Sequence, residues 1–101
     1  MSAAVLSPAA RRDLLAAVRW IAKDNPAAAR AWRDAIVKAA ERIGDHIHLG
    51  SPRPELAGEP YRFLTLTGFS YVIVYNAVRR PPLIVRILHG ARDLPEMLQK
   101  A

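Results

Sequence analysis

Two dipeptides, Ser7-Pro8 and Asn25-Pro26, constrain the fold of this chain most strongly, because each one precedes a helical pattern of apolar residues. Ser and Asn cap helix N-termini, and Pro is tolerated at the first helical position. The first pattern runs to about Asp24 and the second to about Ile43, each with apolar residues three and four positions apart. Because only one or two residues separate them, the sequence predicts an antiparallel helical hairpin.

Sequence patterns typical of β-strands lie before and after the predicted hairpin. A short apolar run, residues 3–6, precedes Ser7 and predicts a first strand, and Gly44 is expected to end the second helix. Residues 44–60 are rich in Pro and Gly and predict a loop. Three runs rich in Val, Ile, Leu and aromatic residues then follow at residues 61–67, 69–78 and 83–89. Their short connections predict an antiparallel meander, and hence an α+β fold in which the hairpin packs on the sheet. A short last helix is expected from Asp93, with Leu94, Met97 and Leu98 docking on the sheet.

Three arginines lie on or just after the predicted strands. Alternation places Arg62 on the face of Leu64 and Leu66, and Arg86 on the face of Ile84 and Leu88. We expect Arg62, Arg86 and Arg92 to meet on one side of the sheet, where they could hold a phosphate or carboxylate. The alternative is ordinary ion pairing with Glu55, Glu59 or Asp93.

The histidines allow two chemical interpretations. His89 could act as a general acid or base with Asp93 as its partner, or it could simply form local hydrogen bonds at the end of its strand. His46 and His48 have a spacing that can chelate zinc, but no third ligand is close in sequence. We therefore predict no metal site and no cofactor.

Two tryptophans, Trp20 and Trp32, lie one on each predicted helix. They could form an exposed aromatic patch for a partner, but burial between the helices is the more usual outcome.

Composition narrows the class of protein. At 101 residues and 51% hydrophobic content, the chain suits one compact domain spanning residues 1–101. It has no cysteine and no apolar run long enough to span a bilayer, so we expect a soluble, cytoplasmic protein without a membrane partner. The net charge of +6 favours an acidic protein surface or nucleic acid as a partner, although a GC-rich genome, which raises the Arg and Ala content of any protein, would give the same balance.

Taken in order along the chain, these motifs resemble the ParE/RelE toxin superfamily, and its ParE branch best. The resemblance covers nearly the whole chain. It rests on the segment 6–14, the Gly-x-Pro loop at residues 49–56, the Tyr61-Arg62 pair, the strand from Tyr71 to Tyr75, and the ending His89-Gly90-Ala91-Arg92-Asp93. It implies an N-terminal strand and an antiparallel helical hairpin packed on a curved antiparallel sheet.

The resemblance also implies a function. ParE-like members are toxins of type II toxin–antitoxin modules that poison DNA gyrase without enzymatic chemistry, and a ParD-like antitoxin neutralises them. Operator DNA would then be bound only through the antitoxin. The resemblance makes Arg62, Arg86, His89 and Arg92 candidates for target binding, and Leu15, Trp20 and Trp32 candidates for antitoxin binding.

RelE-like relatives instead cut messenger RNA on the ribosome. Under that alternative, Arg62 and Arg86 would clamp the phosphate and His89 would be the acid or base. The tail after Pro95 has no aromatic hydroxyl, which departs from the RelE pattern and favours the ParE branch.

Overall fold

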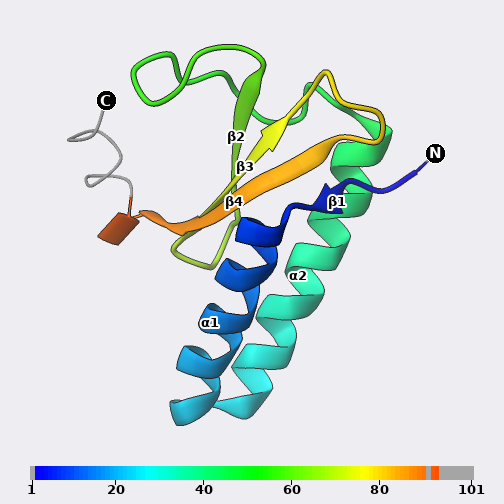
Figure 1. Ribbon diagram of the computed structural model, residues 1–101. Helices are drawn as coiled ribbons and strands as arrows, with labels where there is room; N and C mark the ends of the chain where they lie inside the picture. Colours follow the sequence, from blue (N-terminus) through cyan, green and yellow to red (C-terminus); the bar gives the residue numbers. More distant parts are fainter. Residues whose placement is uncertain (1, 91, 94–101) are drawn as a thin grey trace.

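A helical hairpin packs against one face of a sheet in the computed structural model, which describes residues 2–90, 92 and 93 (Figure 1). Helix α1 spans Pro8–Asp24 and helix α2 spans Pro26–Asp45. Both predicted caps are present. The Ser7 side chain accepts a hydrogen bond from the Ala10 N–H, and the Asn25 side chain accepts one from the Ala28 N–H. The predicted hairpin is thus confirmed.

Helix α2 does not end at Gly44, contrary to the prediction. Gly44 lies inside the helix and is buried, and the helix continues to Asp45. The N-terminal segment crosses the helix at this point, and the Ala4 N–H donates to the Ala40 carbonyl at 2.9 Å. A Cβ on Gly44 would lie 2.8 Å from the Ala3 Cα and still closer to the Ser2 carbonyl oxygen. Glycine is therefore required by the close approach of two backbones.

Within the described residues the sheet has four strands, in the order β1-β4-β3-β2. Strand β1 is Val5–Leu6, β2 is Tyr61–Thr65, β3 is Tyr71–Asn76 and β4 is Leu83–His89. Strands β2, β3 and β4 form the predicted antiparallel meander, and β1 pairs with β4 in parallel. Strands β2 and β3 are shorter than predicted, because residues 66–70 form the connecting turn, in which Gly68 has a φ of 84°.

A register shift in β4 breaks the predicted alternation. Val74 pairs with Arg86 but Tyr75 pairs with Ile84, so Val85 is an extra residue on β4. Ile84 and Ile87 therefore both face the helices, and Arg86 shares the opposite face with Leu88. The prediction that Arg86 lies on the face of Ile84 was wrong, because simple alternation cannot anticipate an inserted residue.

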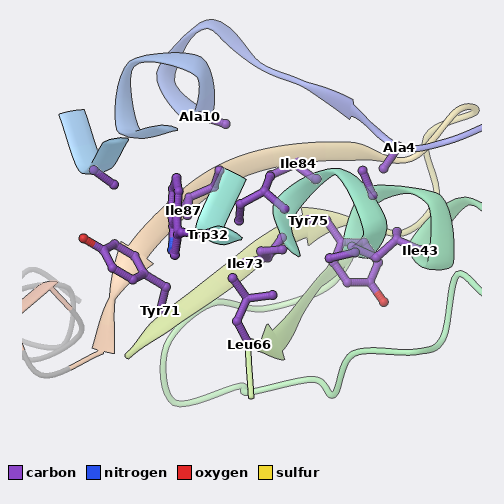
Figure 2. Close-up of a cluster of buried hydrophobic side chains, with 14 of the residues drawn as sticks. Ala4, Ala10, Trp32, Ile43, Leu66, Tyr71, Ile73, Tyr75, Ile84 and Ile87 are labelled. Atoms are coloured by element: carbon purple, nitrogen blue, oxygen red, sulfur yellow. The ribbon is translucent and has the colours of Figure 1, made fainter. Parts of the chain in front are cut away.

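The main core lies between the helices and the sheet (Figure 2). Trp32 from α2 is at its centre, with 0% of its surface exposed, and its ring meets that of Tyr71 edge to face at 5.0 Å between centroids. A smaller cluster on the other face of the sheet holds residues Leu56, Phe63, Val72, Val74 and Leu88. Trp32 is thus a core residue, and the expectation that it contacts the antitoxin was wrong for this folded state.

Gly90, Arg92 and Asp93 are helical, but most of the expected last helix lies outside the described residues, including Leu94, Met97 and Leu98. Neither α1 nor α2 is long and apolar enough to cross a membrane.

Candidate functional site

Asp13 on α1 holds the central part of β4. Its Oδ2 atom accepts hydrogen bonds from Arg86 Nε at 2.8 Å and from the Ile87 N–H at 2.9 Å, and its Oδ1 accepts one from Arg86 Nη2 at 3.1 Å. Nearby, the Ser7 hydroxyl donates to the Val85 carbonyl at 2.9 Å. Side chains from the start of α1 therefore form hydrogen bonds with backbone groups at the edge of β4, where the short strand β1 no longer pairs with it.

The Asp13 carboxylate raises the pKa of Arg86, chiefly through their hydrogen bond. Sequence reasoning missed Asp13, because it lies on a helical face among basic residues and 73 positions from Arg86. Arg86 is thus committed to an intramolecular pair, although 48% of its side chain remains exposed.

His89, Arg92 and Asp93 form a second cluster, at the end of β4. The Asp93 carboxylate accepts from the His89 backbone N–H at 2.7 Å and from Arg92 Nε at 3.1 Å. His89 Nδ1 accepts from the Arg92 N–H at 3.2 Å. This reciprocal pattern resembles a capping box, with His89 in the cap position that was predicted for Asp93. The expected contact between the Asp93 carboxylate and the His89 ring is absent from the hydrogen bonds among the described residues.

This cluster also fixes the His89 ring. Because Nδ1 accepts a hydrogen bond, a neutral imidazole here carries its proton on Nε2. The ring lies edge to face against Tyr71, with 5.2 Å between the ring centroids. Burial opposes ionisation of Asp93, but hydrogen bonds from Arg92 and from the His89 backbone outweigh it and lower the Asp93 pKa.

Arg62 shares a face with Leu64, as predicted, and this face of β2 is the one towards the helices. Arg62 lies at the opposite end of the sheet from His89. Its Nη1 donates to the Gly50 carbonyl at 2.6 Å. The Tyr75 hydroxyl accepts from the Gly50 N–H at 2.8 Å and donates to the Ile47 carbonyl at 2.7 Å. Burial raises the pKa of this Tyr75 hydroxyl, which therefore stays protonated and anchors the loop after α2.

The three arginines do not form one anion site. Arg62 pairs in register with Tyr75 on the helix-facing side, whereas Arg86 pairs with Val74 on the opposite side. Arg92 follows β4 and contacts Asp93. The prediction of a common site was wrong, because the inserted Val85 moves Arg86 to the other face. The roles of these residues in target binding stay predictions.

Two large apolar side chains of α1 are exposed among basic residues such as Arg12 and Arg19. Leu15 is 47% exposed and Trp20 is 63% exposed. A cavity of about 230 Å³ separates Trp20 from the end of β4 and is lined by Asp13, Tyr71 and Arg92 among others. Burial was the more usual expectation for Trp20, and its exposure leaves it free for a partner contact; the roles of Leu15 and Trp20 in antitoxin binding stay predictions.

No three His, Cys, Asp or Glu side chains gather as a metal site within the part of the chain that the structure describes. His46 and His48 are both exposed.

Known proteins resemble this chain in sequence and in fold. Residues 4–94 match the family model described as ParE toxin of type II toxin–antitoxin system, parDE. Toxin RelE3 of Caulobacter vibrioides is 33% identical over 90 residues, which cover 89% of this chain and 96% of that protein. A solved structure titled "Chromosomal ParDE TA system from P. aeruginosa" has the same fold, with a TM-score of 0.70, 21% identity, and coverage of 88% of this chain and 96% of the other. The chain therefore belongs to the ParE toxin family of type II toxin–antitoxin systems.

Proposed function

We propose that this toxin acts in the cytoplasm by poisoning DNA gyrase, without enzymatic chemistry, and that a ParD-like antitoxin neutralises it. The observation that carries the proposal is the separation of Arg62 from Arg86 and His89. Arg62 lies at one end of the sheet, on its helix-facing side, whereas Arg86 lies on the other face.

Cleavage of RNA would need these groups close together. A general base must reach the ribose 2′-OH, and cations must lie beside the same phosphate. Here Asp13 holds Arg86 and the Gly50 carbonyl holds Arg62. His89 uses Nδ1 to accept a backbone hydrogen bond. This arrangement favours a function based on surface contacts.

The alternative is a ribosome-dependent ribonuclease. Two observations favour it: the name of the Caulobacter relative, Toxin RelE3, and the Nε2 atom of His89, which makes no hydrogen bond within the described residues. On the ribosome, His89 would then be the acid or base, with Arg86 or Arg62 beside the phosphate.

Induced expression in a bacterial host without antitoxin separates the two. Gyrase poisoning predicts growth arrest, a DNA damage response and intact messages. Ribonuclease activity predicts rapid message loss that His89→Gln, Arg62→Ala or Arg86→Ala abolishes. Arrest with message loss and no DNA damage would refute the gyrase proposal. Asp13→Ala is a useful companion variant, because it breaks the ion pair of Arg86 and keeps the guanidinium group.

The antitoxin is proposed to lay an amphipathic segment along the outer face of α1. Trp20 and the cavity beside Asp13 and Arg92 provide apolar contacts edged by charged groups, and Leu15 lies further round the helix, where it lines a second cavity with Leu6 and Pro8. The net charge of +6 predicts an acidic antitoxin tail and a rate of association that falls with added salt.

Binding of the cognate antitoxin to full-length toxin variants tests this surface. We expect Trp20→Ala to weaken binding by at least about tenfold, since buried aromatic side chains dominate such interfaces. Val78→Ala is the matched control, because Val78 is also exposed, at 67%, but lies outside α1. Equal affinities of the Trp20→Ala and Val78→Ala variants would place the antitoxin elsewhere.

A further inference from the structure

A cavity of about 390 Å³ lies at the end of the sheet away from His89, bordered by the loop after α2, the start of β2 and the turn between β3 and β4. Figure 1 shows that loop and that turn at the same end of the molecule. Two guanidinium groups, those of Arg62 and Arg80, line the cavity together with His48, Glu59 and Tyr61. None of the interactions described above accounts for this combination.

Each of the two guanidiniums is tethered through one nitrogen. Arg62 Nη1 donates to the Gly50 carbonyl at 2.6 Å. Arg80 Nη1 donates to the Ala77 carbonyl at 2.8 Å and to the Arg79 carbonyl at 3.0 Å. A guanidinium has five N–H donors, so each group is held in place while most of its donors face no protein acceptor within the described part of the chain. Such tethering lowers the entropic cost of binding an anion.

Neither arginine of the cavity has a counter-ion in the described part of the chain, and Arg62 differs from the exposed unpaired arginines, such as Arg19 and Arg79, in being partly buried. Four other arginines each form an ion pair with an Asp or Glu, namely Arg33, Arg53, Arg86 and Arg92. A partly desolvated cation without a counter-ion is unfavourable unless a ligand supplies the negative charge.

The remaining lining groups indicate the kind of anion. Glu59 contributes one negative charge against two positive ones, so the cavity keeps a net positive charge. Tyr61 and His48 add planar rings on which a nucleobase can stack. The volume lies within the range of roughly 300–1,000 Å³ that small-molecule sites occupy.

We propose that this cavity binds a nucleotide through its phosphate group. Arg62 and Arg80 contact the phosphate oxygens, and the rings of Tyr61 and His48 contact the base. The nucleotide is either free or part of a single strand, since both present the same phosphate and base. The proposal does not rest on gyrase being the target, and it shares only Arg62 with the ribonuclease alternative.

Fluorescence anisotropy with a labelled single-stranded DNA oligonucleotide, and competition by unlabelled adenosine 5′-monophosphate, test the proposal on the full-length chain. Arg62→Gln and Arg80→Gln are each expected to weaken binding by at least about tenfold, the effect of losing a charge-assisted contact. Arg19→Gln is the control. It removes the same charge from the exposed face of α1, outside the cavity, and is expected to change binding less than about twofold at moderate salt.

Unfolding midpoints show whether each variant folds. If Arg62→Gln unfolds, Arg80→Gln still tests the site, because Arg80 is exposed and tethers only its own turn. Competition by the mononucleotide supports a free nucleotide, and binding of the oligonucleotide alone supports a strand. Failure of both probes to bind, or equal weakening by Arg19→Gln, overturns the proposal.

Discussion

Asp13 carries the contact between α1 and β4, and removing it tests whether Arg86 has a structural or a functional role. Its carboxylate serves two different donors, the Arg86 guanidinium and the Ile87 backbone N–H. The 48% exposure of Arg86 limits the ion pair to about 0.5–1 kcal/mol, because solvent screens exposed pairs. Loss of the acceptor for the partly buried Ile87 N–H costs a further ~1–3 kcal/mol.

Removing Asp13 should therefore destabilise the protein more than removing Arg86. We expect Asp13→Ala to lower the free energy of unfolding by about 1.5–4 kcal/mol. Arg86→Ala should lower it by no more than about 1 kcal/mol, because Asp13 still accepts from Ile87. Asp13→Asn keeps an acceptor for that N–H and should lie between them.

Urea unfolding of the three variants, followed by circular dichroism, gives these differences directly. Equal destabilisation by Asp13→Ala and Arg86→Ala would refute the reasoning, because the backbone contact would then contribute nothing. A strong loss of toxicity for Arg86→Ala with little loss of stability would show that Arg86 acts on a target.

Other positions give further predictions. Gly44→Ala, which would stabilise an exposed helix, should destabilise this protein by about 1–3 kcal/mol in urea unfolding, because a methyl group would clash with the backbone near Ala3. Trp32→Ala should cost about 3–5 kcal/mol, whereas Trp20→Ala should stay within about 0.5 kcal/mol in the same assay. Because its folded-state pKa is lowered, Asp93 stabilises the fold above the unfolded value of about 3.9. That stability is lost as pH falls through the folded-state pKa. The free energy of unfolding of Asp93→Asn should therefore fall less steeply with decreasing pH than that of the parent chain, and equal pH dependence of the two would contradict this assignment.

Local rules accounted for much of the fold. Ser7 and Asn25 are found as caps in their predicted positions, and the meander of three strands follows from short turns. These features depend on neighbours within a few residues, and such neighbours are visible in a sequence.

The candidate site could be predicted only in part. Arg62 shares a face with Leu64, as alternation requires, and Trp20 is exposed as one of two interpretations allowed. The sequence left open whether Trp32 is buried, since nothing local distinguishes a buried tryptophan from an exposed one on an amphipathic helix. Trp32 is buried because its side of α2 is the one that faces the sheet.

By itself, the sequence determined the helical hairpin, the strands and the family resemblance, because periodicity, capping and motif order are properties of neighbouring residues. The tertiary structure alone decided which arginines are paired and which are not. Asp13 meets Arg86 across 73 positions, the inserted Val85 turns Arg86 away from Arg62, and Gly44 is required by a segment that crosses its helix. Each of these depends on backbones brought together from distant parts of the chain, and no local pattern encodes that distance.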